Sequence, residues 1–199
     1  MNPLILVLII SVLGLVFAVL LAKWVLSKDR GTPAMQEISN AIQQGAEAFL
    51  RRQNATIFKI AIPVALAIFV LYAFLRAVNA ADPTYNAADP AAGARKLAVW
   101  TTISFAFGAL CSIVAGYVGM WVSIRSNIRT ASAARTSLNG ALQIAMRGGA
   151  VSGFLVVSLS LLGVWGIFTI YQTFIGGVTV AEAPFLIVGF GFGASFVAL

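Results

Sequence analysis

The apolar stretch from Pro3 to Ala22 limits the possible folds of this chain more than any other feature, because none of its residues is charged. About 20 apolar residues in an α-helix cross a hydrocarbon core of about 30 Å, and a helix satisfies its own backbone hydrogen bonds there. Comparable runs lie at about 60–75, 97–124 and 150–174, and another begins at Pro184. The sequence therefore predicts an all-α fold, a polytopic transmembrane helix bundle with four complete membrane helices and the start of a fifth.

Composition agrees with a membrane protein. Hydrophobic residues make up 60% of the chain and charged residues only 10%, whereas a soluble domain has about 25% charged residues. Too little polar surface remains to cover a shell exposed to water. We expect the lipid bilayer to solvate most of the chain.

The apolar runs and the polar segments between them predict the helix boundaries. We expect a single transmembrane domain over residues 1–199, with helices at about 3–26, 33–78, 97–124, 141–175 and 184–199. The second helix combines a cytosolic extension with a membrane span. The last run is still apolar at Leu199 and is shorter than a span. This pattern predicts the N-terminal part of a longer protein.

The basic residues predict the orientation in the membrane. Ten of the 13 Lys and Arg residues fall in two connections, at about 23–59 and 125–147, and the other three are Arg76, Arg95 and Lys96. Cytoplasmic connections carry such an excess, so we expect both of them inside and the N-terminus outside. The net charge of +7 then points to anionic lipid headgroups and not to nucleic acid. We expect the inner or plasma membrane of a prokaryote.

The first cytoplasmic connection contains an amphipathic helix. Thr32 is suited to cap this helix and Pro33 to its first turn. Met35, Ile38, Ile42, Gly45 and Phe49 recur every three or four residues, which predicts one apolar face. We expect this face to pack on the chain's own bundle, and docking of a separate partner is the alternative.

Few residues of this chain are suited to catalysis. It has no histidine, six scattered acidic residues and one cysteine, Cys111. This inventory excludes Ser-His-Asp and Cys-His catalysis and lacks the ligands of a zinc site. We therefore expect Cys111 to be a small packing residue, and we expect no catalytic residue and no metal ligand in this chain.

Small residues four positions apart predict close helix contacts, because they let two backbones approach each other in lipid. These residues are Gly108, Ser112 and Gly116, then Gly149 and Gly153, then Gly189 and Gly193. The last pair lies in GFGFG, which has the look of a phosphate loop. It has no preceding strand and no lysine, so we interpret it as a packing site.

Several segments together carry a family resemblance. They are GTPAMQEISNAIQQGAEAFLRRQ at 31–53, AGYVGM at 115–120, NIRTA at 127–131, AMRGGAV at 145–151 and GFGFGAS at 189–195. In order and spacing they resemble the first five helices of the membrane-bound, ion-pumping inorganic pyrophosphatases. The resemblance covers essentially the whole chain.

The resemblance implies a pyrophosphate-energised H⁺ or Na⁺ pump that couples cytoplasmic pyrophosphate hydrolysis to outward ion transport, assembled as a homodimer. It implies Mg²⁺, held by Asp-rich motifs outside this chain, and it allows K⁺ as an activator. Helices one to four would belong to an outer ring. The one site residue it carries over is Ser195, on the ion pathway near the gate. The fragment alone is expected to be inactive.

Two other kinds of protein remain open at this stage. One is a small polytopic membrane scaffold or anchor without enzymatic activity, which would bind partners through the amphipathic helix. The other is a channel or transporter subunit, although no single helix carries the row of polar residues that would line a pore. Ion flux driven by pyrophosphate separates the pump from both.

Overall fold

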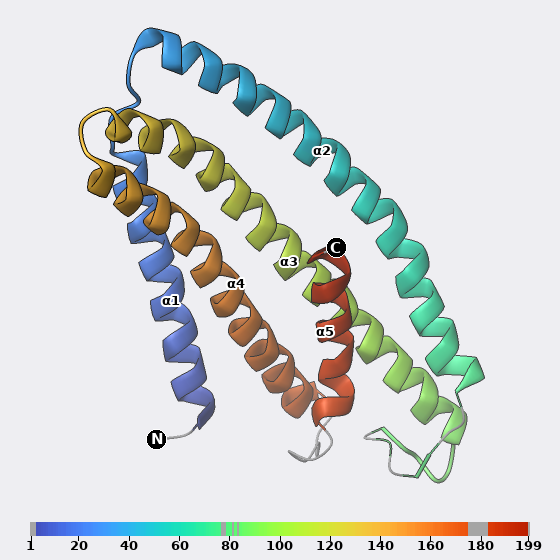
Figure 1. Ribbon diagram of the computed structural model, residues 1–199. Coiled ribbons are helices and arrows are strands. Elements are labelled where there is room, and N and C mark those ends of the chain that lie inside the picture. The colour runs from blue at the N-terminus through green and yellow to red at the C-terminus, as the bar shows by residue number, and fades with distance from the viewer. Residues whose placement is uncertain (1–2, 77–78, 81, 83, 175–182, 199) are drawn as a thin grey trace. The chain divides into compact units, whose positions relative to one another are not determined.

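The computed structural model describes residues 3–76, 79–80, 82, 84–174 and 183–198. Its regular elements are all helical: α1 (Pro3–Leu26), α2 (Pro33–Val70), a π-helical turn η1 (Leu71–Leu75), α3 (Pro90–Ala134), α4 (Leu138–Phe174) and α5 (Ala183–Ala198) (Figure 1). Within these residues, four helices are long and apolar enough to cross a membrane. The predicted all-α transmembrane bundle is confirmed.

Some helices begin or end at other residues than expected, because they continue beyond their apolar run. The third helix was expected at about 97–124, but α3 runs from Pro90 to Ala134, and α4 begins at Leu138 and not at 141. Asp89 caps α3 by accepting a hydrogen bond from the Ala92 amide at 3.0 Å, and Pro90 occupies the first turn. The apolar run marks the membrane span, whereas capping residues set where the helix begins.

The chain forms two compact units that share α2, α3 and α4. Unit 1 comprises residues 1–55 and 114–159, and unit 2 comprises residues 56–113 and 160–199. α1 belongs to unit 1 and α5 to unit 2. The expected single transmembrane domain stays a prediction.

In unit 1, α1 packs along a narrow face of small residues. Ser11, Ala18 and Val25 are buried at seven-residue intervals, and a Cβ on Gly14 would overlap the Ser158 hydroxyl of α4. Figure 1 shows α1 and α4 side by side. The remaining large apolar side chains of α1 are mostly exposed, as expected for a helix that faces lipid.

The apolar face predicted on the N-terminal half of α2 is not covered in unit 1. Ile38, Ile42 and Phe49 are 64%, 58% and 58% exposed, so packing of this face on the chain's own bundle is wrong for the described residues. The polar side of the helix, with Asn40 and Gln43, instead lies near the arginines of α3. This orientation gives the arginines polar neighbours, which charged groups away from water need.

Candidate functional site

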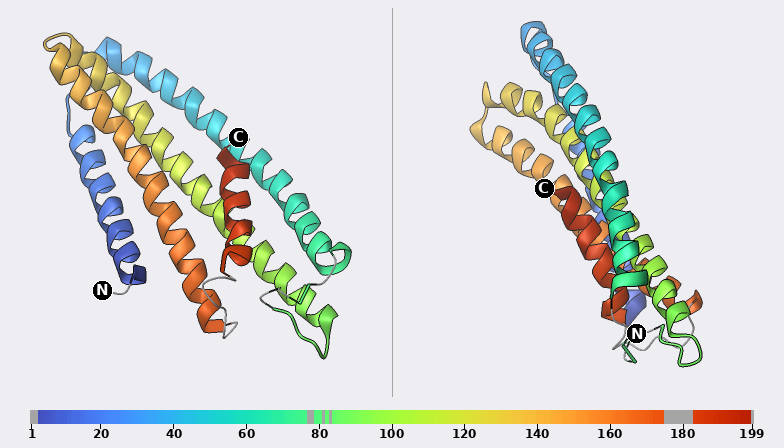
Figure 2. Two further views of the ribbon diagram at one scale, coloured as in Figure 1. Left: turned by 60° about the horizontal axis from the view of Figure 1, so that its bottom comes forward. Right: turned by 90° about the vertical axis from the view of Figure 1, so that its right-hand side faces the viewer.

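Ser195, the residue expected on the ion pathway, lies on α5 in unit 2 with an exposed side chain. The same helix carries Gly189 and Gly193, which face α3. Figure 2 shows α5 lying against α3 in two further views. The contact between these two helices therefore sets where Ser195 is held.

The α3–α5 contact is a backbone-to-backbone approach. A Cβ on Gly193 would overlap the Phe105 carbonyl oxygen and lie 2.8 Å from the Ala109 nitrogen. A Cβ on Gly189 would overlap the Thr101 carbonyl oxygen, and one on Gly108 would overlap the Phe190 carbonyl oxygen. The predicted packing role of Gly189, Gly193 and Gly108 is confirmed, because only glycine permits this spacing.

A polar link and aromatic rings support the same region of α3. Tyr171 of α4 donates a hydrogen bond to the Trp100 carbonyl oxygen at 2.7 Å, and its hydroxyl also contacts the Ser104 hydroxyl. The Trp100 and Tyr171 rings meet edge to face at 5.1 Å. Cys111 packs against the apolar cluster that contains Tyr171 and Phe190, so its predicted packing role is confirmed.

In unit 1, Arg129 of α3 closes the end of α1. Its Nε and Nη2 donate to the Leu26 carbonyl oxygen at 3.2 and 2.9 Å, and Nη1 donates to the Arg125 carbonyl oxygen at 2.5 Å. The side chain is only 8% exposed. A cation at the negative end of a helix is favourable, and here it also satisfies a carbonyl that the helix leaves free.

Cations and tryptophans alternate at this end of unit 1. The Arg125 guanidinium lies 3.9 Å from the centre of the Trp121 ring, and Trp24 is contacted by Lys28 at 4.2 Å and by Arg147 at 3.9 Å. Tryptophan and basic side chains gather where hydrocarbon meets the lipid headgroups. These five residues form a cation–tryptophan belt of the kind that is found at membrane interfaces.

Three of the acidic residues that the structure describes each have a separate partner. Glu47 pairs with Arg125 at 3.2 Å, Asp29 accepts from Ser132 at 2.7 Å, and Asp82 pairs with Arg76 at 2.7 Å. Among the described residues, no group of three His, Cys, Asp or Glu side chains is placed to hold a metal ion. A Mg²⁺ ion needs several oxygen ligands, so the described residues do not fit one.

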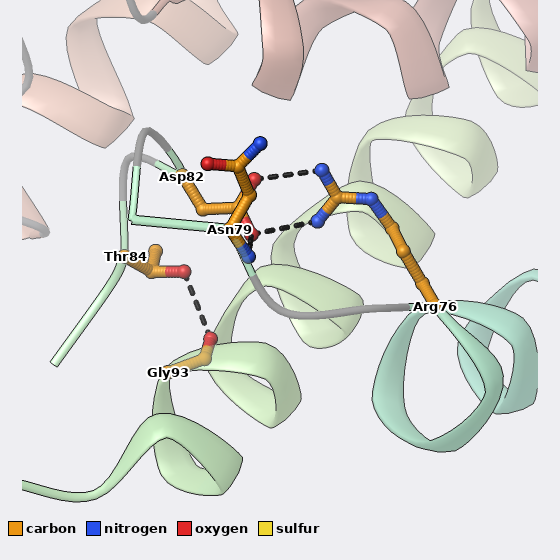
Figure 3. Close-up of polar contacts among 5 residues, drawn as sticks. All are labelled: Arg76, Asn79, Asp82, Thr84 and Gly93. Carbon is orange, nitrogen blue, oxygen red and sulfur yellow. Dashed lines mark hydrogen bonds and ion pairs between the residues drawn. The ribbon is translucent and has the colours of Figure 1, made fainter. Parts of the chain in front are cut away.

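The Asp82 carboxylate organises the connection between α2 and α3 in unit 2. It accepts from both terminal nitrogens of Arg76, at 2.7 and 2.8 Å, and from the Asn79 amide at 3.1 Å, while Thr84 donates to the Gly93 carbonyl oxygen at 2.8 Å (Figure 3). The hydrogen bonds from Arg76 lower the pKa of Asp82 below its usual 3.8 and raise the pKa of Arg76. Both groups therefore stay charged near neutral pH.

Replacing Asp82→Asn is expected to destabilise this connection by about 1–2 kcal/mol, because a bidentate charge-assisted pair is lost. The folded-state pKa of Asp82 is depressed, so its contribution is present above pH 3.8 and is lost as pH falls through the folded pKa. Thermal unfolding of wild type and variant measures the difference, which is expected at pH 7 and reduced at pH 3. Asp89→Asn is the matched control, since Asn caps a helix equally well. A difference that does not change with pH contradicts this account.

The sequence did not predict the role of Arg129, because its contact with Leu26 joins residues far apart in the chain. The spacing Trp121, Arg125, Arg129 places all three on one helix face, which was the available signal. Gly149 and Gly153 were expected to make a close contact, but a Cβ on either would meet nothing within 4 Å among the described residues.

Comparison with known proteins assigns the chain. The profile of the family described as inorganic H⁺ pyrophosphatase matches residues 12–199. Pyrophosphate-energized membrane proton pump 3 of Arabidopsis thaliana is 43% identical over 198 residues, which are 97% of this chain and 24% of that protein. A K⁺-insensitive pyrophosphate-energized proton pump of Caldanaerobacter subterraneus is 45% identical over 184 residues, covering 90% of this chain and 24% of that protein.

A third relative is the K⁺-insensitive pyrophosphate-energized proton pump of Chloroflexus aurantiacus. It is 38% identical over 197 residues, which are 97% of this chain and 24% of that protein. The chain thus spans about a quarter of the length of the curated relatives it matches. The profile match begins within α1 and covers the remaining helices described above. The chain belongs to the inorganic H⁺ pyrophosphatase family.

Proposed function

We propose that this chain is the N-terminal part of a pyrophosphate-energised ion pump, which hydrolyses pyrophosphate in the cytoplasm and moves ions outward. The observation that carries the proposal is the family match over residues 12–199, together with relatives that are named proton pumps. A small scaffold protein is not favoured by that match. The helices described here serve as a membrane framework in this proposal, because the described residues bring no three His, Cys, Asp or Glu side chains together.

We propose H⁺ as the pumped ion, with Na⁺ as the alternative, because the relatives are named proton pumps. Two of these relatives are named K⁺-insensitive, which favours a pump that does not need K⁺. Mg²⁺ would be bound by residues outside this chain, since the described acidic residues do not fit it. In the complete protein the metal would neutralise the phosphate charges.

The proposal also includes an orientation and an assembly. Lys and Arg are in excess in the first and third connections between the helices. This excess favours a cytoplasmic location for both connections and an N-terminus on the outside. The cation–tryptophan belt lies at that same basic end of unit 1. The resemblance further implies a homodimer and a prokaryotic inner or plasma membrane.

The test is ion transport by the complete protein in sealed vesicles. We expect Mg-pyrophosphate to acidify the lumen without added Na⁺ or K⁺, as followed with a pH-sensitive dye. The 199-residue chain alone is the matched control and is expected to hydrolyse no pyrophosphate. Vesicles that never acidify, or that transport Na⁺ in place of H⁺, contradict the proposed ion.

The same assay addresses the proposed place of Ser195 on the ion pathway. Ser195→Ala is expected to lower the ions transported per pyrophosphate several-fold, because a hydroxyl would be lost beside the path. Thr173→Ala is the control, since that exposed hydroxyl donates only to its own helix, to the Thr169 carbonyl oxygen at 2.9 Å. Unchanged transport and unchanged cation dependence in Ser195→Ala remove Ser195 from the pathway.

A further inference from the structure

A cavity of about 310 Å³ lies in unit 1 between the first half of α2 and the end of α3. Three of its lining residues are arginines: Arg30, Arg125 and Arg129. Asn40 and Gln43 of α2 add amide groups to the lining, and none of the lining residues is acidic. A water molecule occupies about 30 Å³ in the liquid, so the cavity accommodates a polyatomic anion with some of its water.

The positive charge around this cavity is only partly balanced. Arg30 donates to the Asn40 amide oxygen at 3.2 Å, which is a neutral partner. Arg129 donates to backbone carbonyl oxygens and is 8% exposed. Arg125 pairs with Glu47 at 3.2 Å. Of the three arginines only Arg129 is buried, and its hydrogen bonds go to neutral carbonyl oxygens and not to a carboxylate. A buried cation without an anion is costly.

Guanidinium groups match the geometry of a tetrahedral oxyanion, because their planar donors bind two oxygens at once. The cation–tryptophan belt places Arg125 at the membrane interface, where lipid phosphates lie. Free phosphate from the aqueous side offers the same chemistry. Both sources present a phosphate group at the level where the three arginines meet.

We infer that this cavity is a binding site for a phosphate group, held by Arg30, Arg125 and Arg129 with the amides of Asn40 and Gln43. The site goes beyond the proposed pump function and does not depend on it. Its ligand is either the headgroup of an anionic phospholipid or a free phosphate anion. The two sources are distinguished by separate measurements.

The first test compares Arg30→Gln with Arg51→Gln in the complete protein. Both residues are exposed on the same basic part of the chain, and only Arg30 lines the cavity. One arm measures binding of radiolabelled inorganic phosphate in nanodiscs of neutral phosphatidylcholine. The other measures retention of phosphatidylglycerol relative to phosphatidylcholine by native mass spectrometry. We expect saturable binding in one of these two arms. In that arm Arg30→Gln is expected to weaken binding about tenfold, and Arg51→Gln is expected to leave it unchanged.

A second pair of variants changes the charge of the cavity lining without replacing an arginine. Gln43→Glu places a carboxylate in the cavity lining, whereas Gln44→Glu makes the same charge change at the exposed neighbour outside the lining. We expect Gln43→Glu to abolish binding and Gln44→Glu to preserve it. Loss in the lipid arm alone identifies a headgroup, and loss in the phosphate arm alone identifies a free anion. Absence of saturable binding in both arms, or equal effects within each pair of variants, overturns the proposal.

Discussion

Gly193→Val is expected to separate α5 from α3 and to destabilise unit 2 by about 3 kcal/mol, at the upper end of overpacking effects. The new Cβ would overlap the Phe105 carbonyl oxygen and crowd the Ala109 nitrogen. Both are backbone atoms of a continuous helix, so neither can rotate away as a side chain would. Separation of the helices would also remove the contact between the Phe105 and Phe196 rings, whose centres are 5.9 Å apart.

The single cysteine of the chain provides a local measurement. Cys111 lies on α3 and is partly buried against the cluster that contains Phe190 of α5. If α5 moves away, the rate of Cys111 labelling by N-ethylmaleimide is expected to rise several-fold, since labelling then requires less local opening. Mass spectrometry of the Cys111 peptide measures this rate.

Gly191→Val is the matched control for this prediction. It makes the same substitution on the same helix, two residues away, where a Cβ would meet none of the described residues within 4 Å. We expect its unfolding temperature and its Cys111 labelling rate to stay near the wild-type values. Equal rates in Gly191→Val and Gly193→Val contradict the close α3–α5 contact. In the complete pump, loss of transport in Gly193→Val alone would link this contact to function.

The glycines of α5 and α4 show how far the sequence predicts helix packing. The spacing of Gly189 and Gly193 places both on one face, and that face meets α3. Gly149 and Gly153 have the same spacing, yet the close contact is made by Gly148, where a Cβ would overlap the Ser126 hydroxyl. A shift of one residue turns a helix by about 100°. Because lipid accepts apolar residues on every side, the sequence alone does not say which small-residue face meets a neighbour.

The charged residues show a similar limit. The apolar runs predicted the membrane spans, because the hydrocarbon excludes charges over a fixed thickness. The same rule says nothing of helix turns beyond the membrane, so α3 extends past the expected 124 to Ala134. Arg125 and Arg129 lie in that extension. A contact such as that between Arg129 and Leu26 depends on the spatial approach of α1 to α3, which local periodicity does not encode.

Arg129→Met is expected to loosen the end of α1 and to destabilise unit 1 by about 2 kcal/mol, because hydrogen bonds from a charged donor are lost. The other carbonyl oxygens of the last turn keep their partners. Those of Lys23, Trp24 and Val25 accept from Ser27 and Lys28 at 2.8–3.1 Å. The Leu26 carbonyl oxygen would lose both of its hydrogen bonds from Arg129. Methionine keeps much of the apolar stem, so the change tests the guanidinium and not the packing.

Hydrogen exchange of the amides at residues 27–31 measures this loosening, since those amides follow directly on the end of α1. We expect exchange there to accelerate about tenfold in Arg129→Met, in line with a loss of 1–2 kcal/mol of local stability. Arg51→Met removes an exposed cation from α2 and is expected to leave exchange at 27–31 unchanged. Relief of repulsion from Arg30 and Arg125 acts in the opposite direction. Slower exchange in Arg129→Met would therefore mean that repulsion within the arginine cluster outweighs the bonds to Leu26, and it would contradict this prediction.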